Sequence, residues 1–243
     1  MKITKQISFY KDLYKHYLYY KTSNPFKEHK YLNNNEPIPK TIHYVWFGNN
    51  PYNDIIKKCI KTWEDQEGYT IKKWDENNFP FKLYPFAEQA YKQKRWAMVS
   101  DVARLHAIFF EGGIYVDTDI EIIKPLDDFL NNCDAFMGYE DEHCLASCIL
   151  AGKQFHPWFA LMLYWYKIIN FEPRYQIIAN TRILSRITRF FYNVKLNGNH
   201  INLPNNTHIF PRDYFHPKEN PTINSDFLIT ENTHTIHHAT ALW

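Results

Sequence analysis

The sequence predicts an α/β fold in which helices flank a sheet, on three observations: a strand–helix–strand succession, a long helix that runs directly into a buried strand, and a later group of strand pairs. Lys40–Gly48 reads as a first strand, residues 52–64 as a helix with an apolar inner side, and Tyr69–Glu76 as a second strand. A βαβ unit of this kind joins two parallel strands. We therefore expect a sheet whose first strands are parallel.

A second helix and strand follow this unit. Apolar residues recur every three or four positions over Phe86–Glu111, which predicts one long helix. Its apolar stripe consists of Met98, Val102, Leu105 and Phe109. Gly112 and Gly113 end the helix, and the apolar strand Ile114–Val116 starts directly after them.

The later elements alternate between strands and helices. A proline predicts the start of a helix within residues 124–130, residues 134–152 read as strand pairs, and residues 155–170 read as an aromatic-rich helix. Residues 181–192 predict a further helix, and residues 233–243 end the sequence in a strand or a loop. Helices and strands therefore mix to the end of the sequence.

Length and charge limit the classes of protein to consider. The 243 residues are 45% apolar and 22% charged, which fits a globular domain with a sizeable core. We expect an N-terminal basic and aromatic helical arm over residues 1–35 and one main domain over residues 36–243. The net charge of +2 is too small for a typical nucleic-acid-binding protein, so no nucleic-acid partner is expected.

The arm is where positive charge gathers. Residues 1–31 contain seven Lys against one Asp and one Glu, and Leu13, Tyr14, Tyr17 and Leu18 recur at helical spacing. Such a helix either packs on the domain or makes peripheral contact with an anionic membrane or a partner. The sequence leaves both interpretations open.

Cysteines and apolar runs predict the compartment. The four cysteines are Cys59, Cys133, Cys144 and Cys148, and the last two form a close pair that lacks the second pair of a zinc site. The N-terminus has no apolar signal region, and the most apolar run, residues 158–169, is too short to span a bilayer. We expect a reduced, cytoplasmic protein with free thiols.

Two aspartates directly after the buried strand are the main functional signal. Asp117 and Asp119, separated by Thr118, lie where ligands bind in open α/β sheets, beyond the carboxyl end of a strand. In extended geometry, residues two apart point to the same side, so both carboxylates would face one ligand. Carboxylate oxygens suit Mn²⁺ or Mg²⁺, which keep positions free for phosphate oxygens. A solvated acidic turn is the alternative.

A second pair of charges precedes them. Asp101 and Arg104 stand three apart on the long helix, so they share one face of it. They either form a local ion pair or present an acceptor and a cation to a substrate. The pair alone leaves this choice open.

With these residues in place, the stretch "SDVARLHAIFFEGGIYVDTDIEIIKPLD" resembles the DXD-containing sugar-binding region of glycosyltransferase family 32, and is more distantly similar to clostridial glucosylating toxins. The resemblance extends over residues 36–243, from "IPKTIHYVWFG" to "HHATALW". It implies a GT-A fold, which is a Rossmann-like mixed sheet flanked by helices. It also implies a retaining, metal-dependent transfer from a nucleotide sugar.

The resemblance also implies roles for single residues. Asp101, Arg104, Asp117 and Asp119 would be catalytic, and Trp46 would stack on the donor base. Gly112 and Gly113 would let the backbone approach the nucleotide. The complete implied set for the nucleotide sugar is Val45, Trp46, Asp101, Arg104, Gly113, Asp117, Thr118, Asp119 and Trp243. Asp117 and Asp119 would bind the metal, Asp117 partly through the metal's water.

The C-terminal segment departs from the family. Members of the family often read His-His-Trp-x-x-Ser-Trp, whereas Ala239 and Leu242 replace the first Trp and the Ser here. His238, or His237 in its place, would be the third metal ligand. Trp243 would close over the diphosphate. The alternative is a tail whose histidines have no role.

The implied reaction moves a hexose from a UDP- or GDP-sugar, UDP favoured, to a saccharide or lipid-linked acceptor. The expected setting is bacterial capsule or lipopolysaccharide synthesis, with the arm at the inner membrane face. A haloacid-dehalogenase-like phosphohydrolase also places D-x-D after an apolar strand, although Glu121 stands where such enzymes usually have Thr or Val. A catalytically inactive nucleotide-sugar-binding module is the third possibility.

Overall fold

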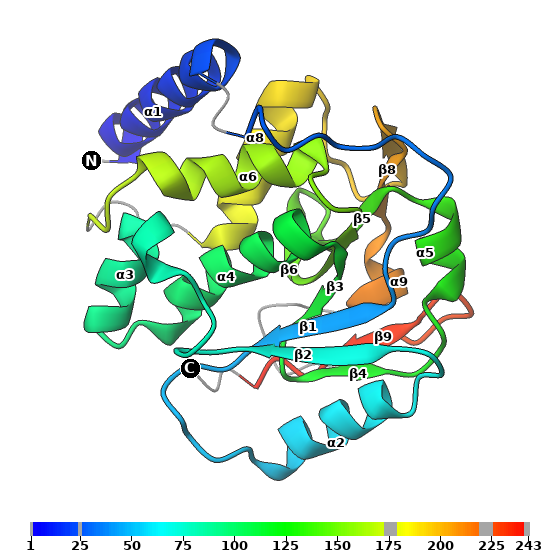
Figure 1. The fold of residues 1–243 in the computed structure, drawn as a ribbon. Helices are drawn as coiled ribbons and strands as arrows, with labels where there is room; N and C mark the ends of the chain where they lie inside the picture. The colour runs from blue at the N-terminus through cyan, green and yellow to red at the C-terminus, as the bar shows by residue number, and fades with distance from the viewer. Residues whose placement is uncertain (1, 24–25, 173–178, 219–225, 241–243) are drawn as a thin grey trace.

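A computed structural model describes residues 2–23, 26–172, 179–218 and 226–240 of the chain. Its centre is a seven-stranded sheet in the order β2-β1-β3-β6-β5-β8-β7 (Figure 1). The strands of this sheet are β1 (Thr41–Val45), β2 (Thr70–Trp74), β3 (Gly113–Val116), β5 (Ala135–Asp141), β6 (Cys144–Gly152), β7 (Ile201–Leu203) and β8 (Thr207–Phe210). A separate antiparallel pair is formed by β4 (Ile120–Ile122) and β9 (Thr235–His237).

Helices cover both faces of the seven-stranded sheet, with α4 and α6 on one side and α2 on the other (Figure 1). The α-helices are α1 (Lys2–Ser23), α2 (Asp54–Glu64), α3 (Pro85–Lys92), α4 (Trp96–Glu111), α5 (Asp127–Asn132), α6 (Pro157–Ile168), α8 (Asn180–Tyr192) and α9 (Arg212–Phe215). A 3₁₀ turn covers Phe81–Leu83. The alternation predicted from the sequence is therefore confirmed.

The sheet is mixed. β1 pairs in parallel with β2, as the βαβ pattern predicts, and β1 also pairs in parallel with β3. β6 runs antiparallel to β3 and β5, and β7 runs antiparallel to β8. The carboxyl ends of β1 and β3 consequently lie at one edge of the sheet, next to the amino-terminal half of β6.

The long helix predicted over Phe86–Glu111 is two helices. The helical conformation is interrupted between α3 and α4 at Lys94, whose φ is +56°. The N–H of Arg95 donates to the carbonyl of Ala90 at this point. Neither Gly nor Pro marks this break, so hydrophobic periodicity alone runs straight through it. The break sets the direction of α4, which carries Asp101 and Arg104.

Each face of the sheet has its own hydrophobic core, and β3 shows how side chains alternate between the two. Tyr115 belongs to the core under α4 and α6, whereas Ile114 and Val116 belong to the core under α2, α5 and α9. All three are fully buried. β3 is thus fixed on both sides, and the residues that follow it are held in place.

Gly112 and Gly113 join α4 to β3, with φ of +69° and +105°. A Cβ atom on Gly113 would lie 2.5 Å from the carbonyl oxygen of Thr41 and 3.1 Å from Nε2 of His43. Gly113 starts β3 and Asp117 follows its end, so the two lie at opposite ends of the strand. The missing side chain of Gly113 therefore serves the packing of β1 on β3, and not a nucleotide at the aspartates as its predicted role requires.

The N-terminal arm forms the helix α1, which packs beside α6 (Figure 1). Leu13 and His16 are fully buried, and His16 Nε2 lies 3.0 Å from the carbonyl oxygen of Leu161. Tyr14, Leu18 and Tyr19 keep 55%, 44% and 55% of their surface exposed. The helix therefore packs on the domain by one face and presents aromatic and aliphatic side chains on another. No helix within the described ranges has the length and apolarity needed to cross a bilayer.

We expect acid to destabilise the protein through His16. Burial lowers the pKa of His16 from 6.5 to about 4, so between these values the unfolded chain binds a proton that the folded chain excludes. The free energy of unfolding should fall by roughly 2 kcal/mol between pH 7 and pH 5 because of this group. Denaturant unfolding of a His16→Phe variant should show a correspondingly shallower loss, whereas His143→Gln, at an exposed position, should leave the slope unchanged. Equal slopes for wild type and His16→Phe would contradict this assignment.

Candidate functional site

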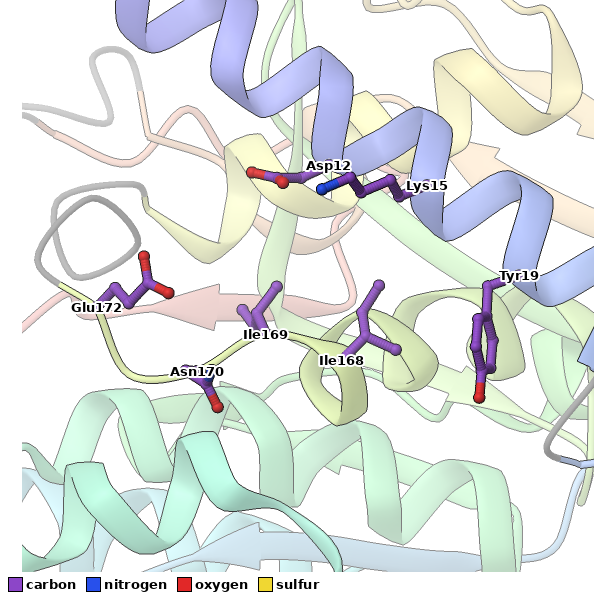
Figure 2. A pocket seen from close by; sticks show the side chains of 7 residues that line it. All are labelled: Asp12, Lys15, Tyr19, Ile168, Ile169, Asn170 and Glu172. Atoms are coloured by element: carbon purple, nitrogen blue, oxygen red, sulfur yellow. The ribbon is translucent and has the colours of Figure 1, made fainter.

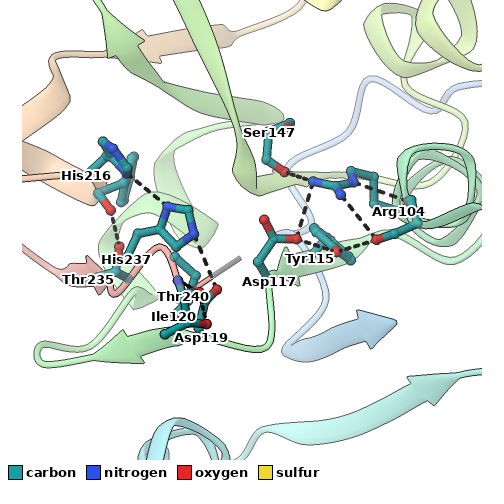
Figure 3. Close-up of polar contacts among 12 residues, drawn as sticks. Arg104, Tyr115, Asp117, Asp119, Ile120, Ser147, His216, Thr235, His237 and Thr240 are labelled. Carbon is teal, nitrogen blue, oxygen red and sulfur yellow. Dashed lines mark hydrogen bonds and ion pairs between the residues drawn. The ribbon is translucent and has the colours of Figure 1, made fainter. Parts of the chain in front are cut away.

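Asp117, Thr118 and Asp119 lie at the edge where β1 and β3 end, as predicted, but in a turn. The N–H of Ile120 donates to the carbonyl of Asp117 at 3.0 Å, so the chain reverses between β3 and β4. The expected extended geometry is therefore wrong. The two carboxylates have different neighbours: Asp117 lies between Arg104 and the group formed by Asp119 and His237 (Figure 3).

Arg104 is the buried cation of the site, with 3% of its surface exposed. It donates to the carbonyl of Ser147 at 2.5 Å and to the carbonyl and Oγ of Ser100 at 3.2 and 3.1 Å. Its Nη2 lies 3.3 Å from Asp101 Oδ1, and its Nη1 lies 3.3 Å from Asp117 Oδ1. The local ion pair of Asp101 with Arg104 is therefore present, and the same guanidinium also reaches the aspartate turn. The alternative, that the two residues face a substrate, stays a prediction.

Asp117 is held by two partners through one oxygen. The Tyr115 hydroxyl donates to its Oδ1 at 2.6 Å, and Arg104 approaches the same oxygen. Burial raises the pKa of Asp117, while the charge of Arg104 opposes that increase. Burial would lower the pKa of Arg104, but Asp117 raises it, so the guanidinium stays charged. This network fixes Oδ1 of Asp117 in place.

Asp119 is held from the C-terminal segment. Its Oδ2 accepts hydrogen bonds from the backbone N–H and the hydroxyl of Thr240, both at 2.8 Å, and its Oδ1 lies 3.3 Å from Nε2 of His237. Burial would raise the pKa of Asp119, but the contacts with His237 and Thr240 outweigh it and hold this pKa well below its usual range. Asp119 is therefore a carboxylate, which is the form that binds metal.

His238, the predicted third metal ligand, points elsewhere. Its Nε2 lies 2.9 Å from Oε2 of Glu121, which also accepts from Lys58 at 2.8 Å. Its backbone N–H donates to the carbonyl of Asp119, which continues the β4–β9 ladder. Side chains alternate along a strand, so His237 and not His238 turns towards Asp119.

Asp119 and His237 fit one divalent ion. Two ligands at roughly 2.1 Å from an octahedral ion lie roughly 3 Å apart, and the 3.3 Å between Asp119 Oδ1 and His237 Nε2 is close to that separation. Mn²⁺ accepts both imidazole nitrogen and carboxylate oxygen. Burial would lower the pKa of His237, but its contacts with Cys148 and Asp119 raise it, so metal would have to displace a proton from this ring. With that proton released, the pair suits Mn²⁺ or Mg²⁺ and leaves several positions for water or phosphate.

The side of the site near β1 carries an accessible aromatic ring. Trp46 follows β1, is partly exposed, donates through Nε1 to the carbonyl of Asn50 at 2.8 Å, and contacts Tyr52 edge to face. Val45 is buried in the core under α4, whereas Trp46 packs against the core on the other face of the sheet. Thr118 is buried in the aspartate turn. Trp243, expected to cover a diphosphate, lies outside the described residues.

Asp101 is the acidic group nearest to Arg104 on α4. Burial raises the pKa of Asp101 to about 6, against the opposing charge of Arg104. Asn180 also acts to lower the pKa of Asp101, and Asn180 Oδ1 accepts a hydrogen bond from the hydroxyl of Tyr166 at 2.8 Å. The start of α8 therefore closes the site on the side opposite to β1.

Sequence reasoning missed several residues that the fold adds. A small pocket of about 70 Å³ adjoins the aspartate turn. Its lining consists of Asp117, Glu140, Ala146, Ser147, Cys148, Thr181, His216 and His237. Glu140 lies within the acidic stretch 140–142, and burial raises its pKa. The other missed residues carry no motif, because they come from β6, from α8 and from the residue after α9, which only the fold brings together.

A larger groove lies away from this chemistry. It has a volume of about 440 Å³ and runs between α1 and the end of α6 (Figure 2). Its lining consists of Asp12, Lys15, Tyr19, Ile168, Ile169, Asn170 and Glu172. None of the residues predicted for the site lines it. We therefore place the functional site at the aspartate turn, where charge and buried polar groups converge.

The sequence model described as "Glycosyltransferase sugar-binding region containing DXD motif" matches residues 2–136. This range includes Asp101, Arg104 and the aspartate turn. It ends before β6 and β9, so it does not contain Ser147 or His237.

Two curated proteins are similar to part of the chain. Toxin Afp18 of Yersinia ruckeri is 30% identical over 134 residues, which cover 41% of this chain and 6% of the toxin. Inositol phosphoceramide mannosyltransferase 1 of Schizosaccharomyces pombe is 25% identical over 107 residues, covering 40% of this chain and 32% of that protein. The chain thus spans less than a third of the length of either relative.

The fold comparison extends further along the chain. The structure titled "PaToxG Glycosyltransferase" has a TM-score of 0.50 and 18% sequence identity, and the match covers 76% of this chain and 80% of that one. Together with the mixed seven-stranded sheet flanked by helices, this likeness identifies the fold as GT-A.

Proposed function

Because the chain belongs to the family of glycosyltransferase sugar-binding regions containing a DXD motif, we propose that it transfers a hexose from a nucleotide sugar to a hydroxyl of an acceptor. The observation that supports this most is the meeting of Asp119 and His237 at the spacing of two ligands of one ion, beside the buried Arg104. A divalent ion and a fixed cation are what a departing diphosphate requires.

In this proposal Mn²⁺ or Mg²⁺ would be held by Asp119 Oδ1 and His237 Nε2, and Asp117 would reach it through a bound water. An ion held there would supply Lewis-acid stabilisation of the charge on the diphosphate leaving group. Thr240 orients Asp119 through two hydrogen bonds, and Tyr115 and Arg104 orient Asp117. The side chains around the ion are thus fixed before the donor binds, which preserves their electrostatic contribution.

The base and the sugar of the donor would bind at two different sides of the site. Trp46 offers a ring face to the nucleotide base. Asp101, whose pKa is raised to about 6, accepts a hydrogen bond from a sugar hydroxyl in its ionised form, and Arg104 stabilises that form. Water is excluded by the burial of Arg104, Asp117 and Asp119, each at most 6% exposed.

We further propose a UDP-sugar, with a GDP-sugar as the second choice, and retention of anomeric configuration. The acceptor is a saccharide or a lipid-linked saccharide, and the setting is bacterial capsule or lipopolysaccharide synthesis in the cytoplasm. These details rest on the resemblance of "SDVARLHAIFFEGGIYVDTDIEIIKPLD" to family 32. The mannosyltransferase name of one relative keeps GDP-mannose among the donors to test.

The test is release of nucleoside diphosphate from a panel of UDP- and GDP-sugars with Mn²⁺, alongside EDTA controls. Metal-dependent release from one donor would support the proposal and name that donor. Phosphate release from phosphomonoesters instead would favour the phosphohydrolase alternative. Donor binding without release, with and without saccharide acceptors, would favour an inactive binding module.

The arm adds a prediction about membranes. Lys11, Lys15 and Lys21 are exposed on α1 beside Tyr14 and Leu18, so this helix would bring the site to anionic lipid. We expect binding to phosphatidylserine vesicles that weakens with salt. Since each Lys near the surface contributes about 1 kcal/mol and each new Glu is repelled by anionic lipid, the double variant Lys11→Glu/Lys15→Glu should bind at least roughly thirtyfold more weakly.

The matched control for the arm is Lys82→Glu/Lys94→Glu, which changes two exposed lysines of the main domain and should bind vesicles like wild type. Cosedimentation with vesicles measures both variants. Equal binding to neutral vesicles, or equal loss in the two double variants, would exclude a specific role of α1.

A further inference from the structure

His237 has two further metal-ligating side chains next to it, on the side of its ring away from Asp119. Cys148 lies on β6, His216 directly follows α9, and His237 ends β9. One ligand atom from each of the three lies within 4.8 Å of the others. We propose that Cys148, His216 and His237 form a second metal site, specific for thiophilic divalent ions of the Zn²⁺ class.

The burial of His216 and one unpaired nitrogen of its ring support this proposal. His216 is 3% exposed, its Nδ1 lies 3.1 Å from Nδ1 of His237, and its Nε2 is buried without a hydrogen-bond partner among the described residues. A buried polar atom without a partner costs about 1–3 kcal/mol. Native proteins retain such atoms where an ion or a catalytic role accounts for them.

The ligand types distinguish this site from the aspartate turn. A cysteine sulfur with two imidazole nitrogens is a set that Zn²⁺ prefers, whereas the oxygens of Asp117 and Asp119 suit Mg²⁺ and Mn²⁺. Ligands of a tetrahedral zinc ion lie roughly 3.3–3.7 Å apart. The three ligand atoms lie within 4.8 Å of one another. Side-chain rotations that move each atom by less than about 1 Å would bring them to the separation that zinc requires.

The surroundings match those of a zinc ligand. A histidine that binds metal usually directs its other ring nitrogen at a carboxylate, and His237 Nε2 lies 3.3 Å from Asp119 Oδ1. The backbone N–H of Asp117 donates to the carbonyl of Cys148 at 2.8 Å, which fixes β6 against the aspartate turn. Three protein ligands leave a fourth position, and the pocket of about 70 Å³ that all three line has room for a water molecule there.

Sharing of His237 makes the two metal sites dependent on each other. In the proposed function His237 Nε2 binds Mn²⁺ or Mg²⁺, whereas at the second site the ring binds zinc and turns its other nitrogen to Asp119 as a hydrogen-bond donor. Zinc would therefore compete with Mn²⁺ for this residue. This competition rests on the proposed function, but the existence of the zinc site does not.

The test uses Co²⁺ as a spectroscopic substitute for Zn²⁺ on the full chain, with a non-thiol reductant and no donor. We expect one equivalent of Co²⁺ to give the intense visible absorption of tetrahedral ligation and a near-ultraviolet cobalt–thiolate band, both removed by one equivalent of Zn²⁺. Cys148→Ala should abolish the thiolate band. Cys133→Ala, which removes another buried thiol, should leave it unchanged.

Further variants keep the test decisive. His216→Gln should lower the affinity for Co²⁺ while the circular dichroism spectrum stays that of wild type. Asp119→Asn should keep the thiolate band and weaken Co²⁺ binding about 10–100-fold, because only the residue that orients His237 changes. No thiolate band in wild type, or a band that survives in Cys148→Ala, would overturn the proposal. Either result leaves the donor-turnover test of the proposed function untouched.

Discussion

Replacing Asp119 by alanine is expected to lower the rate of nucleoside diphosphate release about a thousandfold at saturating Mn²⁺. Asp119 is the carboxylate whose Oδ1 faces His237 Nε2 while Oδ2 is fixed by Thr240. A metal ion contributes several kcal/mol to the stabilisation of the developing charge, and about 4 kcal/mol corresponds to three powers of ten in rate. Steady-state assays with the donor identified by the panel would measure it.

The matched control is Asp128→Ala, because Asp128 is an exposed aspartate in the first turn of α5. Its rate should stay within about twofold of wild type, as expected for surface positions. The two variants should unfold at similar denaturant concentrations if Asp119 acts in the reaction and not in the fold. An Asp119→Ala enzyme with more than a tenth of the wild-type rate would contradict the assignment of Asp119 to the metal.

Replacing Arg104 by alanine is expected to reduce the free energy of unfolding by about 3–5 kcal/mol. The guanidinium is 3% exposed, and removing it leaves the buried carboxylate of Asp117 and the partly buried carboxylate of Asp101 without their common cation. It also frees the carbonyl of Ser147, which accepts a hydrogen bond from Arg104 at 2.5 Å. Urea unfolding followed by fluorescence would measure this loss.

A double-mutant cycle separates these contributions. In an Asp117→Asn background, Arg104→Ala should cost about 1–3 kcal/mol less than in wild type, because one of the two stranded charges is already absent. Arg104→Lys keeps the charge but loses the planar set of donors, so it should fall between wild type and alanine. A cycle without any coupling between the two positions would show that Asp117 and Arg104 do not stabilise each other.

Much of the fold could be predicted from periodicity because its main elements satisfy local rules. β1, α2 and β2 appear where strand and helix patterns place them, and the fully buried β3 is a continuous apolar run. The interruption of the helix at Lys94 was not predicted, because a positive φ at a lysine has no signature in the sequence. The strand β4 was not predicted, because three residues between a turn and a proline are too few to show a hydrophobic period.

The site was predictable where a motif carried it. The position of Asp117 and Asp119 follows from a strand end, and the meeting of Asp101 with Arg104 follows from helical spacing. The choice between His237 and His238 depends on the register in which β9 pairs with β4. A shift of one residue would exchange the directions of the two side chains, and the sequence does not define that register. Cys148 and His216 had no signal, because their proximity depends on the pairing of distant segments.

The pair of β4 with β9 gives the chain a definite order of assembly. All strands of the seven-stranded sheet end by Phe210, so they are synthesised before β9. Thr240 reaches Asp119 across 121 positions of sequence, a closure whose entropic cost grows only slowly with length. The ability to hold the ion is therefore gained only once the segment that contains β9 and Thr240 has docked on β4.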